Sequence, residues 1–578
     1  MHCLAWPALI CDPHARVCVD VTVEPAVCRG YPRVYKMHDS TMFNQQNLSA
    51  NEDLTLTSRA PKTSVDAGER LDADTFRSDA NAISALQIGA IELQKGNLTE
   101  AEIAYRRALK LKPDFAEVLN NLGILFAATK RFVEAEFAYR RALEIKPDFV
   151  EVLNNLGILL WESKRWVEAE TTYRRVLEIK PDFVEAHNNL GNLLRDAGRV
   201  VEAEFAYRCA LEAKPDWVEV QNNLGKLLKE IGRPVEAEVA FRRALELKPD
   251  SADVRHNLAC FLLGSGRYAE AWEHYESRYD PSLKDGVAVA PNHLPFPRWQ
   301  GERLANKSLV IWAEEGFGDQ IQFARYIPLL KRRGVSRIIL VCNDALKPLL
   351  ETVEGVDAVL TNPNTVPLHD YWSLFMSLPL HFATTVQTVA ARVPYVFPLR
   401  ERIERWRKKL PCDGLRVGLV WKGSVLHSND AKRSLPAISA LSPLWSVPGV
   451  TFISLQKGQG EDEAIRPPAG QPLIPLGRDI QDFADTAAIV SQLDLTICID
   501  TSVAHVAGAL GKPCWVLLPY VSDWRWLQDR SDSPWYPKGM RLFRQPKSDG
   551  WTDVIDEVTV ALKNWALTHP CAQSDRSE

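Results

Sequence analysis

The chain has 578 residues, a length that exceeds what one hydrophobic core supports, and its hydrophobic and charged fractions of 46% and 25% are ordinary for a folded protein. A formal net charge of -5 gives no reason to expect nucleic acid as a partner, and no apolar run is long enough to span a membrane. The 11 cysteines form no Cys-x-x-Cys pair, which argues against a zinc site or a disulfide framework and indicates a reducing cytoplasm.

Residues 1–79 show no sustained helical or strand periodicity. From residue 44 to residue 77 they are rich in Ser, Thr, Asn, Asp and Glu. This composition predicts a disordered leader. Four of the 11 cysteines fall in the first 28 residues, whose composition differs from everything that follows. We therefore hypothesise that the natural start is Met37 or Met42.

The tripeptide Lys-Pro-Asp recurs every 34 residues from Lys112 to Lys248. A fixed period of this length predicts stacked helical hairpins. Each unit has a small residue in its first helix, such as Gly123, and an aromatic residue in its second, such as Tyr139. We expect the small residues to let the two helices approach and the aromatic rings to fill the space between units. The pattern resembles the tetratricopeptide repeat and predicts an all-α solenoid of six units over residues 80–286.

The sixth unit departs from the pattern. It lacks a closing Lys-Pro-Asp and has Arg278 where earlier units have Ala or Val. Terminal units of repeat arrays are commonly atypical, because one face has no neighbouring unit. We therefore predict that the sixth unit caps the array.

An asparagine recurs at one register of the repeats, at Asn121, Asn155, Asn189, Asn223 and Asn257. Stacked units place these amides in a row on the concave face, where each can donate to and accept from a peptide backbone. A similar ladder is a feature of the O-linked N-acetylglucosamine transferases, so the resemblance implies a protein or peptide in the groove. The alternative is that this asparagine belongs to the repeat consensus and bonds between helices.

After a short linker at residues 287–304, stiffened by Pro295 and Pro297, the pattern changes. Strand-length apolar runs alternate with helical segments, first at 309–313, 338–341 and 356–360, then at 415–421, 451–455, 495–499 and 513–518. This alternation predicts two α/β halves with parallel sheets, at 305–400 and 413–570, and a ligand crevice at the carboxyl ends of their strands. Residues 571–578 form a tail.

The apolar run at 495–499 stops at Asp500, Thr501 and Ser502, and a helix pattern follows. Such a turn favours a phosphate, although these residue types also commonly cap helices. The stretch resembles the donor-site motif of the heptosyltransferase-like glycosyltransferases, which have the two-domain GT-B fold with Rossmann-like halves. The matching residues are Asp500, Thr501, His505, Gly508, Gly511 and Pro513. Ser502 stands where that family often has glycine.

This resemblance implies a metal-independent, bacterial-type glycosyltransferase that uses a nucleotide-diphosphate sugar as co-substrate and needs no other cofactor. Gly318 and Asp319 resemble the Gly-Asp at the first turn of the family, where the aspartate is the general base. The alternative is that Asp319 only caps its helix. Pro328 lies further from Asp319 than the family's usual proline. As in GT-B enzymes, we expect the closing helix at 553–567 to cross back to the first half.

Several further residues are candidates for holding the donor. Lys422 could neutralise the diphosphate as charge develops on the leaving oxygen, and Lys457 could approach the base or ribose. His505 could bond a phosphate or be structural, and Trp524 could stack on a base or serve packing. The full donor set is Gly318, Lys422, Gly423, Ser424, Lys457, Asp500, Thr501, Ser502, His505 and Trp524.

Two functional hypotheses follow. In the first, the solenoid selects a protein or glycan acceptor and the α/β region transfers a sugar to it, with Asp319 as general base. In the second, the chain is a non-catalytic scaffold that binds peptides and carries a degenerate transferase domain.

Overall fold

The computed structural model describes residues 8–10, 19–21, 73–283, 294–314, 316–390, 392–427, 429–547 and 550–569. The chain divides into two compact units, Met1–Asn155 and Leu156–Glu578. Most of the predicted leader, both hypothesised start sites and the predicted tail lie outside the described residues. Within the leader, strand β1 (Ala8–Ile10) pairs antiparallel with β2 (Val19–Val21), and helix α2 begins at Ala73, before the predicted end of the leader.

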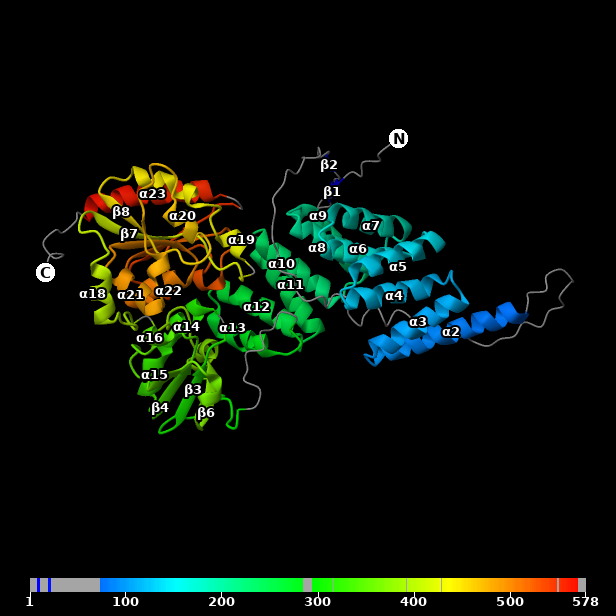
Figure 1. Cartoon of the computed structure of the whole chain (residues 1–578), viewed down its shortest axis with the longest axis horizontal. Helices are drawn as coiled ribbons and strands as arrows, with labels where there is room; N and C mark the ends of the chain where they lie inside the picture. The colour runs from blue at the N-terminus through cyan, green and yellow to red at the C-terminus, as the bar shows by residue number, and fades with distance from the viewer. Residues whose placement is uncertain are drawn as a thin grey trace. The chain divides into compact units, whose positions relative to one another are not determined.

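The repeat region consists of helical pairs that follow the 34-residue register (Figure 1). In each pair the turn between the helices contains a residue with positive φ, a glycine or, in two pairs, Lys130 or Lys164. The helices are α2 (Ala73–Gln94), α3 (Leu98–Leu111), α4 (Ala116–Ala128), α5 (Phe132–Ile145), α6 (Val150–Glu162), α7 (Trp166–Ile179), α8 (Val184–Asp196), α9 (Val200–Ala213), α10 (Val218–Glu230), α11 (Pro234–Leu247), α12 (Ala252–Gly264) and α13 (Tyr268–Tyr275).

The glycine and the aromatic residue that recur in the repeats pack against each other and join the two helices of a unit. A Cβ added to Gly191 would lie 2.6 Å from Cε1 of Tyr207, and one added to Gly123 would lie 2.3 Å from Cε1 of Tyr139. Each ring therefore rests directly on the glycine of its own unit. The prediction that small residues permit close approach agrees with this packing, but the rings fill space within a unit and not only between units.

The sixth unit does not end the solenoid with a free polar face. Its second helix, α13, has eight residues and continues into the 3-10 helix η1 (Glu276–Tyr279). The indole Nε1 of Trp272 donates to the carbonyl of Thr384 at 2.8 Å, and the hydroxyl of Tyr268 accepts from Nε1 of Trp535 at 2.9 Å. The sixth unit is thus a junction with the α/β region rather than the cap that the sequence predicted.

The α/β region contains a four-stranded parallel sheet in the order β5-β4-β3-β6. Its strands are β3 (Ser308–Trp312), β4 (Arg337–Val341), β5 (Ala358–Leu360) and β6 (Tyr371–Leu374). Helix α14 (Phe317–Phe323) follows β3 directly. The change of direction in strand order lies between β3 and β6, which places the end of β3 where ligands of such sheets bind.

A second parallel sheet has six strands in the order β12-β11-β10-β7-β8-β9. Its strands are β7 (Leu415–Val420), β8 (Val450–Ser454), β9 (Ile474–Pro475), β10 (Leu495–Ile499), β11 (Cys514–Leu518) and β12 (Met540–Arg544). Because β7 and β10 are neighbours, the order reverses between them. The loop after β7 and the turn after β10 therefore meet at one edge.

Helices cover both faces of the six-stranded sheet (Figure 1). Helix α23 (Trp551–Thr568) packs on one face, where Val558 and Leu562 join a core that includes Val417 and Ile497. The prediction that the closing helix crosses back to the first half is therefore wrong. Apolar residues spaced three and four apart along α23 bury best against the apolar strands beside which the helix begins.

Candidate functional site

The turn after β10 has a geometry that side-chain capping does not explain. Helix α22 (Ser502–Leu510) begins at this turn, and its N-cap residue Thr501 makes no side-chain cap hydrogen bond. The Thr501 hydroxyl is buried and has no hydrogen-bond partner among the described residues. Ser502 is the first residue of the helix and is half-buried. The backbone N–H of Ala504 donates to the Thr501 carbonyl at 3.0 Å, which leaves the N–H groups of Ser502 and Val503 in the first helical turn available to an anion.

Arg433 joins the ends of β7 and β10. Its Nη1 donates to the carbonyl of Asp500 at 3.1 Å, and its Nε lies 3.5 Å from Oδ1 of Asp430. A Cβ on Gly423 would lie 2.7 Å from Nη2 of Arg433, so only glycine lets the guanidinium lie this close to the β7 loop. The amide of Gly423 in turn donates to Oγ of Ser434 at 2.9 Å. A cation is thus fixed at the point where strand order reverses.

The carboxyl group of Asp500 is perturbed by its surroundings. Burial raises the pKa of Asp500 to about 6, the negative charge of Asp523 adds to the rise, and Arg433 opposes it. Perturbed carboxyl groups of this kind are frequent at functional sites but also occur in structural networks. At neutral pH Asp500 is mostly ionised, and it becomes neutral in mildly acidic solution.

The other predicted donor residues after β7 and β8 are held less directly. Lys422 Nζ forms an ion pair with Oε1 of Glu463 at 2.9 Å, and Gln456 Oε1 accepts from the Lys422 amide at 3.0 Å. Ser424 is exposed, and its hydroxyl accepts from the backbone of the following loop. Lys457 is exposed, and its Nζ donates to the carbonyl of Gly477 at 3.4 Å. An anion would have to compete with Glu463 for Lys422.

His505 and Gly318 bring the two sheets' loops together. A Cβ on Gly318 would lie 2.6 Å from Cδ2 of His505, so α14 and α22 approach closely through this glycine. His505 Nδ1 lies 2.9 Å from the hydroxyl of Tyr536, and its ring stacks on Trp526 at 5.4 Å. Burial, helped by Arg525, lowers the pKa of His505 to about 3. The imidazole is therefore neutral at physiological pH.

Asp319 lies at this same approach of α14 and α22. Its carboxylate forms an ion pair with Arg525, which also donates from Nη1 to Asp523 at 2.8 Å. The N-cap of α14 is Gly316, so Asp319 is not the capping residue. The Asp319 side chain is 18% exposed and the Arg525 side chain 10%. The structure therefore places the predicted base beside the predicted donor motif, with an arginine that the sequence did not single out for this role.

Trp524 has no free face for a nucleobase. It is buried, and its ring contacts the rings of Tyr268, Trp272 and Tyr275 at 6.3, 5.8 and 5.9 Å. Of the two alternatives that the sequence left open for Trp524, packing is the one that this geometry favours. The tryptophan anchors the sixth repeat to the loop that carries Arg525.

The sequence patterns did not predict the buried ionic network at the end of β3. Arg278 Nη2 lies 3.3 Å from Oε2 of Glu314, and these side chains are 5% and 1% exposed. The Met376 amide donates to Oε1 of Glu314 at 2.5 Å, and Arg278 Nη2 donates to Ser377 at 3.1 Å. Burial raises the pKa of Glu314 to about 7, against the pull of Arg278. The signal was present in the sequence, since Arg278 breaks the repeat pattern where a small residue is expected.

The asparagine ladder makes hydrogen bonds between successive repeats. Asn223 Nδ2 donates to Oδ1 of Asn188 at 3.1 Å, and Asn257 Nδ2 donates in the same way to Asn222 at 3.1 Å. Asn155 Nδ2 donates to Asn120 at 2.9 Å. Asn121 and Asn155 are buried, whereas Asn189 is half-buried. The alternative that the asparagine bonds between helices therefore explains these three hydrogen bonds. Each of them uses one N–H donor of a ladder amide, and an amide group can make further hydrogen bonds.

The residues three and six positions after the ladder asparagine differ in polarity between repeats. Trp161 and Ile158 of the third repeat are replaced at the same register by Arg195 and, two repeats later, Lys226. Burial and the nearby charge of Arg195 lower the pKa of Lys226 to about 8. The later repeats thus have cations at positions where the third repeat has Trp161 and the buried Ile158, and Arg195 forms an ion pair with Asp196 at 3.2 Å.

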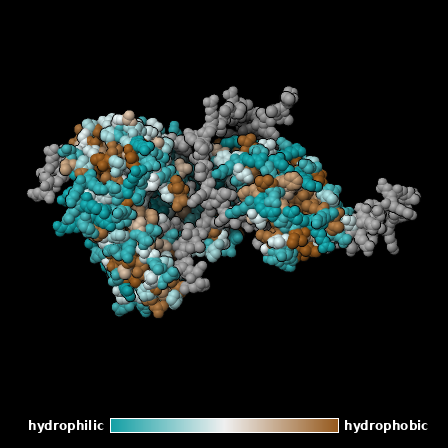
Figure 2. Space-filling model, in the orientation of Figure 1, coloured by the Kyte–Doolittle hydropathy of each residue, from teal (hydrophilic) through white to brown (hydrophobic). Residues whose placement is uncertain are grey.

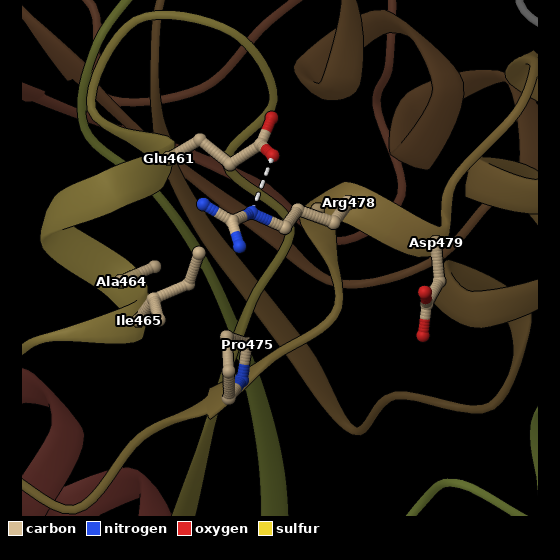
Figure 3. Close-up of a pocket in the computed structure, with 7 residues that line it drawn as sticks. Glu461, Ala464, Ile465, Pro475, Arg478 and Asp479 are labelled. Carbon is tan, nitrogen blue, oxygen red and sulfur yellow. Dashed lines mark ion pairs between the residues drawn. The ribbon is translucent and has the colours of Figure 1, made fainter.

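A small pocket lies at the edge of the six-stranded sheet, away from the β7–β10 junction (Figure 3). Its volume is about 170 Å³, and Arg478 Nε spans it toward Oε1 of Glu461 at 3.4 Å. Typical small-molecule sites enclose roughly 300–1,000 Å³. The lining contains none of the predicted donor residues, so this pocket is not the predicted site.

Comparisons with known proteins agree on the helical region. Models of the tetratricopeptide repeat match residues 86–148, 126–192, 218–251 and 240–273. The solenoid is a tetratricopeptide repeat array. No helix among the described residues is both long and apolar enough to cross a membrane.

One curated relative is Protein FlbA of Caulobacter vibrioides, which is 29% identical over 324 residues. The match covers 52% of this chain and 53% of FlbA, so the chain spans about half the length of this relative. Among solved structures, PilF of Pseudomonas aeruginosa is 22% identical with a TM-score of 0.32, covering 36% of this chain and 95% of PilF. YrrB, a tetratricopeptide repeat protein with a peptide-binding site, is 21% identical with a TM-score of 0.27, covering 32% of this chain and 97% of YrrB.

Proposed function

We propose that this protein is a cytoplasmic glycosyltransferase of the GT-B type. It transfers a sugar from a nucleotide-diphosphate sugar to a protein or glycan acceptor that the repeats select. The observation that carries the proposal is the contact of Gly318 with His505 beside the Asp319–Arg525 ion pair. Two loops that resemble the base motif and the donor motif of one enzyme family, about 180 residues apart, meet at this contact.

The diphosphate would lie at the start of α22. Backbone N–H groups of the helix N-terminus and the guanidinium of Arg433 are the groups that a departing phosphate needs, because both stabilise negative charge without reorganising. The neutral imidazole of His505 lies on the same helix. Asp319 would accept the proton of the acceptor hydroxyl, and Arg525 would fix the orientation of that carboxylate.

The repeats would supply the acceptor. The amides of Asn223 and Asn257 can make further hydrogen bonds beyond those between repeats, and the later repeats add Arg195 and Lys226. These groups favour an extended polypeptide with acidic residues in the segment that contacts the later repeats. The sixth repeat is packed on the loop that contains Arg525, which would deliver such a segment toward the reacting groups.

Nucleotide binding can be tested by thermal shift with UDP, GDP and ADP, each compared with its monophosphate and its sugar conjugates. A ligand at a hundredfold excess over its dissociation constant stabilises the native state by about 2.7 kcal/mol. We expect one diphosphate to raise the melting temperature more than its monophosphate. Arg433→Gln should abolish the shift, whereas Arg400→Gln, at a side chain that is 92% exposed, should leave it intact. Absence of any shift would favour the scaffold hypothesis.

The base assignment has its own test. With the sugar nucleotide that gives the shift, nucleotide release should fall by on the order of a hundredfold in Asp319→Asn, since a general base is typically worth that much. Binding of the same donor should persist. Asp462→Asn is the matched control, because that carboxylate is 93% exposed. Unchanged release in Asp319→Asn would refute the role of Asp319 while leaving donor binding standing.

A further inference from the structure

Cys260 and His256 form a close pair on α12, the first helix of the sixth repeat. A separation of four residues places both side chains on one helix face. Cys260 Sγ lies 3.6 Å from His256 Nε2. The His256 ring stacks on Tyr275 at 5.7 Å with an interplanar angle of 23°, which fixes its orientation. Cys260 is half-buried, so a small reagent can reach it.

The charges that face this pair come from three elements. His256 lies on the same helix, Lys229 on α10, and Asp523 in the loop that precedes Arg525. Burial disfavours the thiolate, but His256 and Lys229 outweigh burial and lower the pKa of Cys260, while Asp523 opposes them. The pKa of Cys209, in contrast, is raised, mainly by burial. Proximity to histidine and lysine is the setting in which thiolates form and react.

We propose that Cys260 is a nucleophilic thiol, activated by His256, and a site of covalent modification by small electrophiles. With a carbon electrophile such as iodoacetamide, the thiolate sulfur forms a bond to the methylene carbon as the carbon–iodine bond breaks and iodide leaves. Cys260 follows the ladder residue Asn257 by one helical turn, so both lie on the same side of α12. An adduct there would occupy the face that carries the ladder. The proposal holds whether or not the protein transfers sugars.

The first test is alkylation of the native full-length protein by limiting iodoacetamide, with each cysteine followed by peptide mass spectrometry between pH 5.5 and 9. Cys412 is the internal reference, because it is exposed on the surface. At pH 6.5 we expect Cys260 to react roughly tenfold faster than Cys412, because the histidine and lysine near Cys260 favour its thiolate. The rates should converge in urea. A native Cys260 that reacts no faster than Cys412 below pH 8 overturns the proposal.

Variants test whether the reactivity of Cys260 comes from its charged neighbours or only from its exposure to solvent. His256→Gln should slow Cys260 roughly tenfold at pH 6.5 and shift its pH profile upward, with Cys412 unchanged. His187→Gln, on α8, is the matched control and should change neither rate. Lys229→Gln, which alters a different helix, should slow Cys260 about two- to threefold. The proposal is refuted if His256→Gln retains the circular dichroism spectrum of the native protein and Cys260 reacts at an unchanged rate. If His256→Gln does not fold, Lys229→Gln decides, and an unchanged rate of Cys260 in that variant refutes the proposal.

Discussion

The inner repeats of the solenoid and the contact between its last repeat and the α/β region hold charged residues in opposite ways. In the solenoid, arginines and glutamates pair on the surface at the repeat interval, as Arg199 does with Glu170 at 2.7 Å with side chains 39% and 21% exposed. At the end of β3, Arg278 and Glu314 are almost fully buried. Exposed pairs contribute little because water screens them, whereas breaking a buried pair leaves a charge that water cannot reach. Charges therefore serve solubility and register in one region and conformational specificity in the other.

The largest expected effect tests this contrast directly. Arg278→Met should destabilise the protein by about 3–5 kcal/mol in urea unfolding, because Glu314 loses its buried partner. Since burial already raises the pKa of Glu314 to about 7, the loss should be greatest above pH 7 and shrink in acid, where Glu314 is protonated. The double variant Arg278→Met/Glu314→Gln should recover most of the stability. Arg199→Met in the solenoid should cost at most about 1 kcal/mol. Equal losses for the two single variants would contradict the contrast.

The second prediction compares two glycines against which a ring packs, Gly191 in the solenoid and Gly318 in the α/β region. A Cβ at Gly191 or at Gly318 would lie 2.6 Å from a buried ring carbon, of Tyr207 or of His505. Each change to alanine should cost about 1–3 kcal/mol by overpacking, measured by urea unfolding. Only Gly318→Ala should also reduce nucleotide release, because it moves α14 and its Asp319 relative to α22. Equal effects of both variants on release would argue that Asp319 is remote from the reaction.

A third prediction concerns pH at the Asp500 turn. Because burial raises the pKa of Asp500 to about 6, its negative charge is present above pH 6 and is lost as pH falls through 6. Removal of that charge should strengthen nucleotide-diphosphate binding roughly tenfold between pH 7.5 and 5.5, equivalent to about 1.4 kcal/mol. Isothermal titration calorimetry measures this change. Asp500→Asn lacks the titrating group and isolates the protonation of the nucleotide itself, so an identical pH dependence in the variant would rule Asp500 out.

The smallest expected effect lies in the ladder. Asn223→Ala removes the hydrogen bond to Asn188 and should cost about 0.5–1.5 kcal/mol in stability. Peptide affinity, measured by fluorescence polarisation with an acidic probe such as a hexaglutamate peptide carrying a dye, should fall as well. Val235→Ala, at a residue of α11 that is 76% exposed, is the control for affinity. An unchanged affinity in Asn223→Ala would contradict a role of this ladder residue in peptide binding. Apolar residues also reach the surface of the repeat region and would then be the alternative contact (Figure 2).

The sequence by itself determined the elements whose partners lie nearby in the chain. The 34-residue period specifies each helical pair, and the packing of Tyr139 on Gly123 follows because both belong to one hairpin. The longer strands, such as β7 and β10, were also predictable from apolar runs. Short strands such as β6 and β9 were missed, because so few residues carry no readable periodicity.

Only the tertiary structure decided which distant residues meet. The order of the six-stranded sheet places the end of β7 beside the end of β10, and this brings Arg433 to Asp500. The pairing of Asp319 with Arg525 and the burial of Trp524 under the sixth repeat depend on segments hundreds of residues apart. Local pattern records which face of an element is apolar, but not which other element covers it. The residue types of the candidate site were therefore readable from the sequence, whereas their ion pairs and shifted pKa values were not.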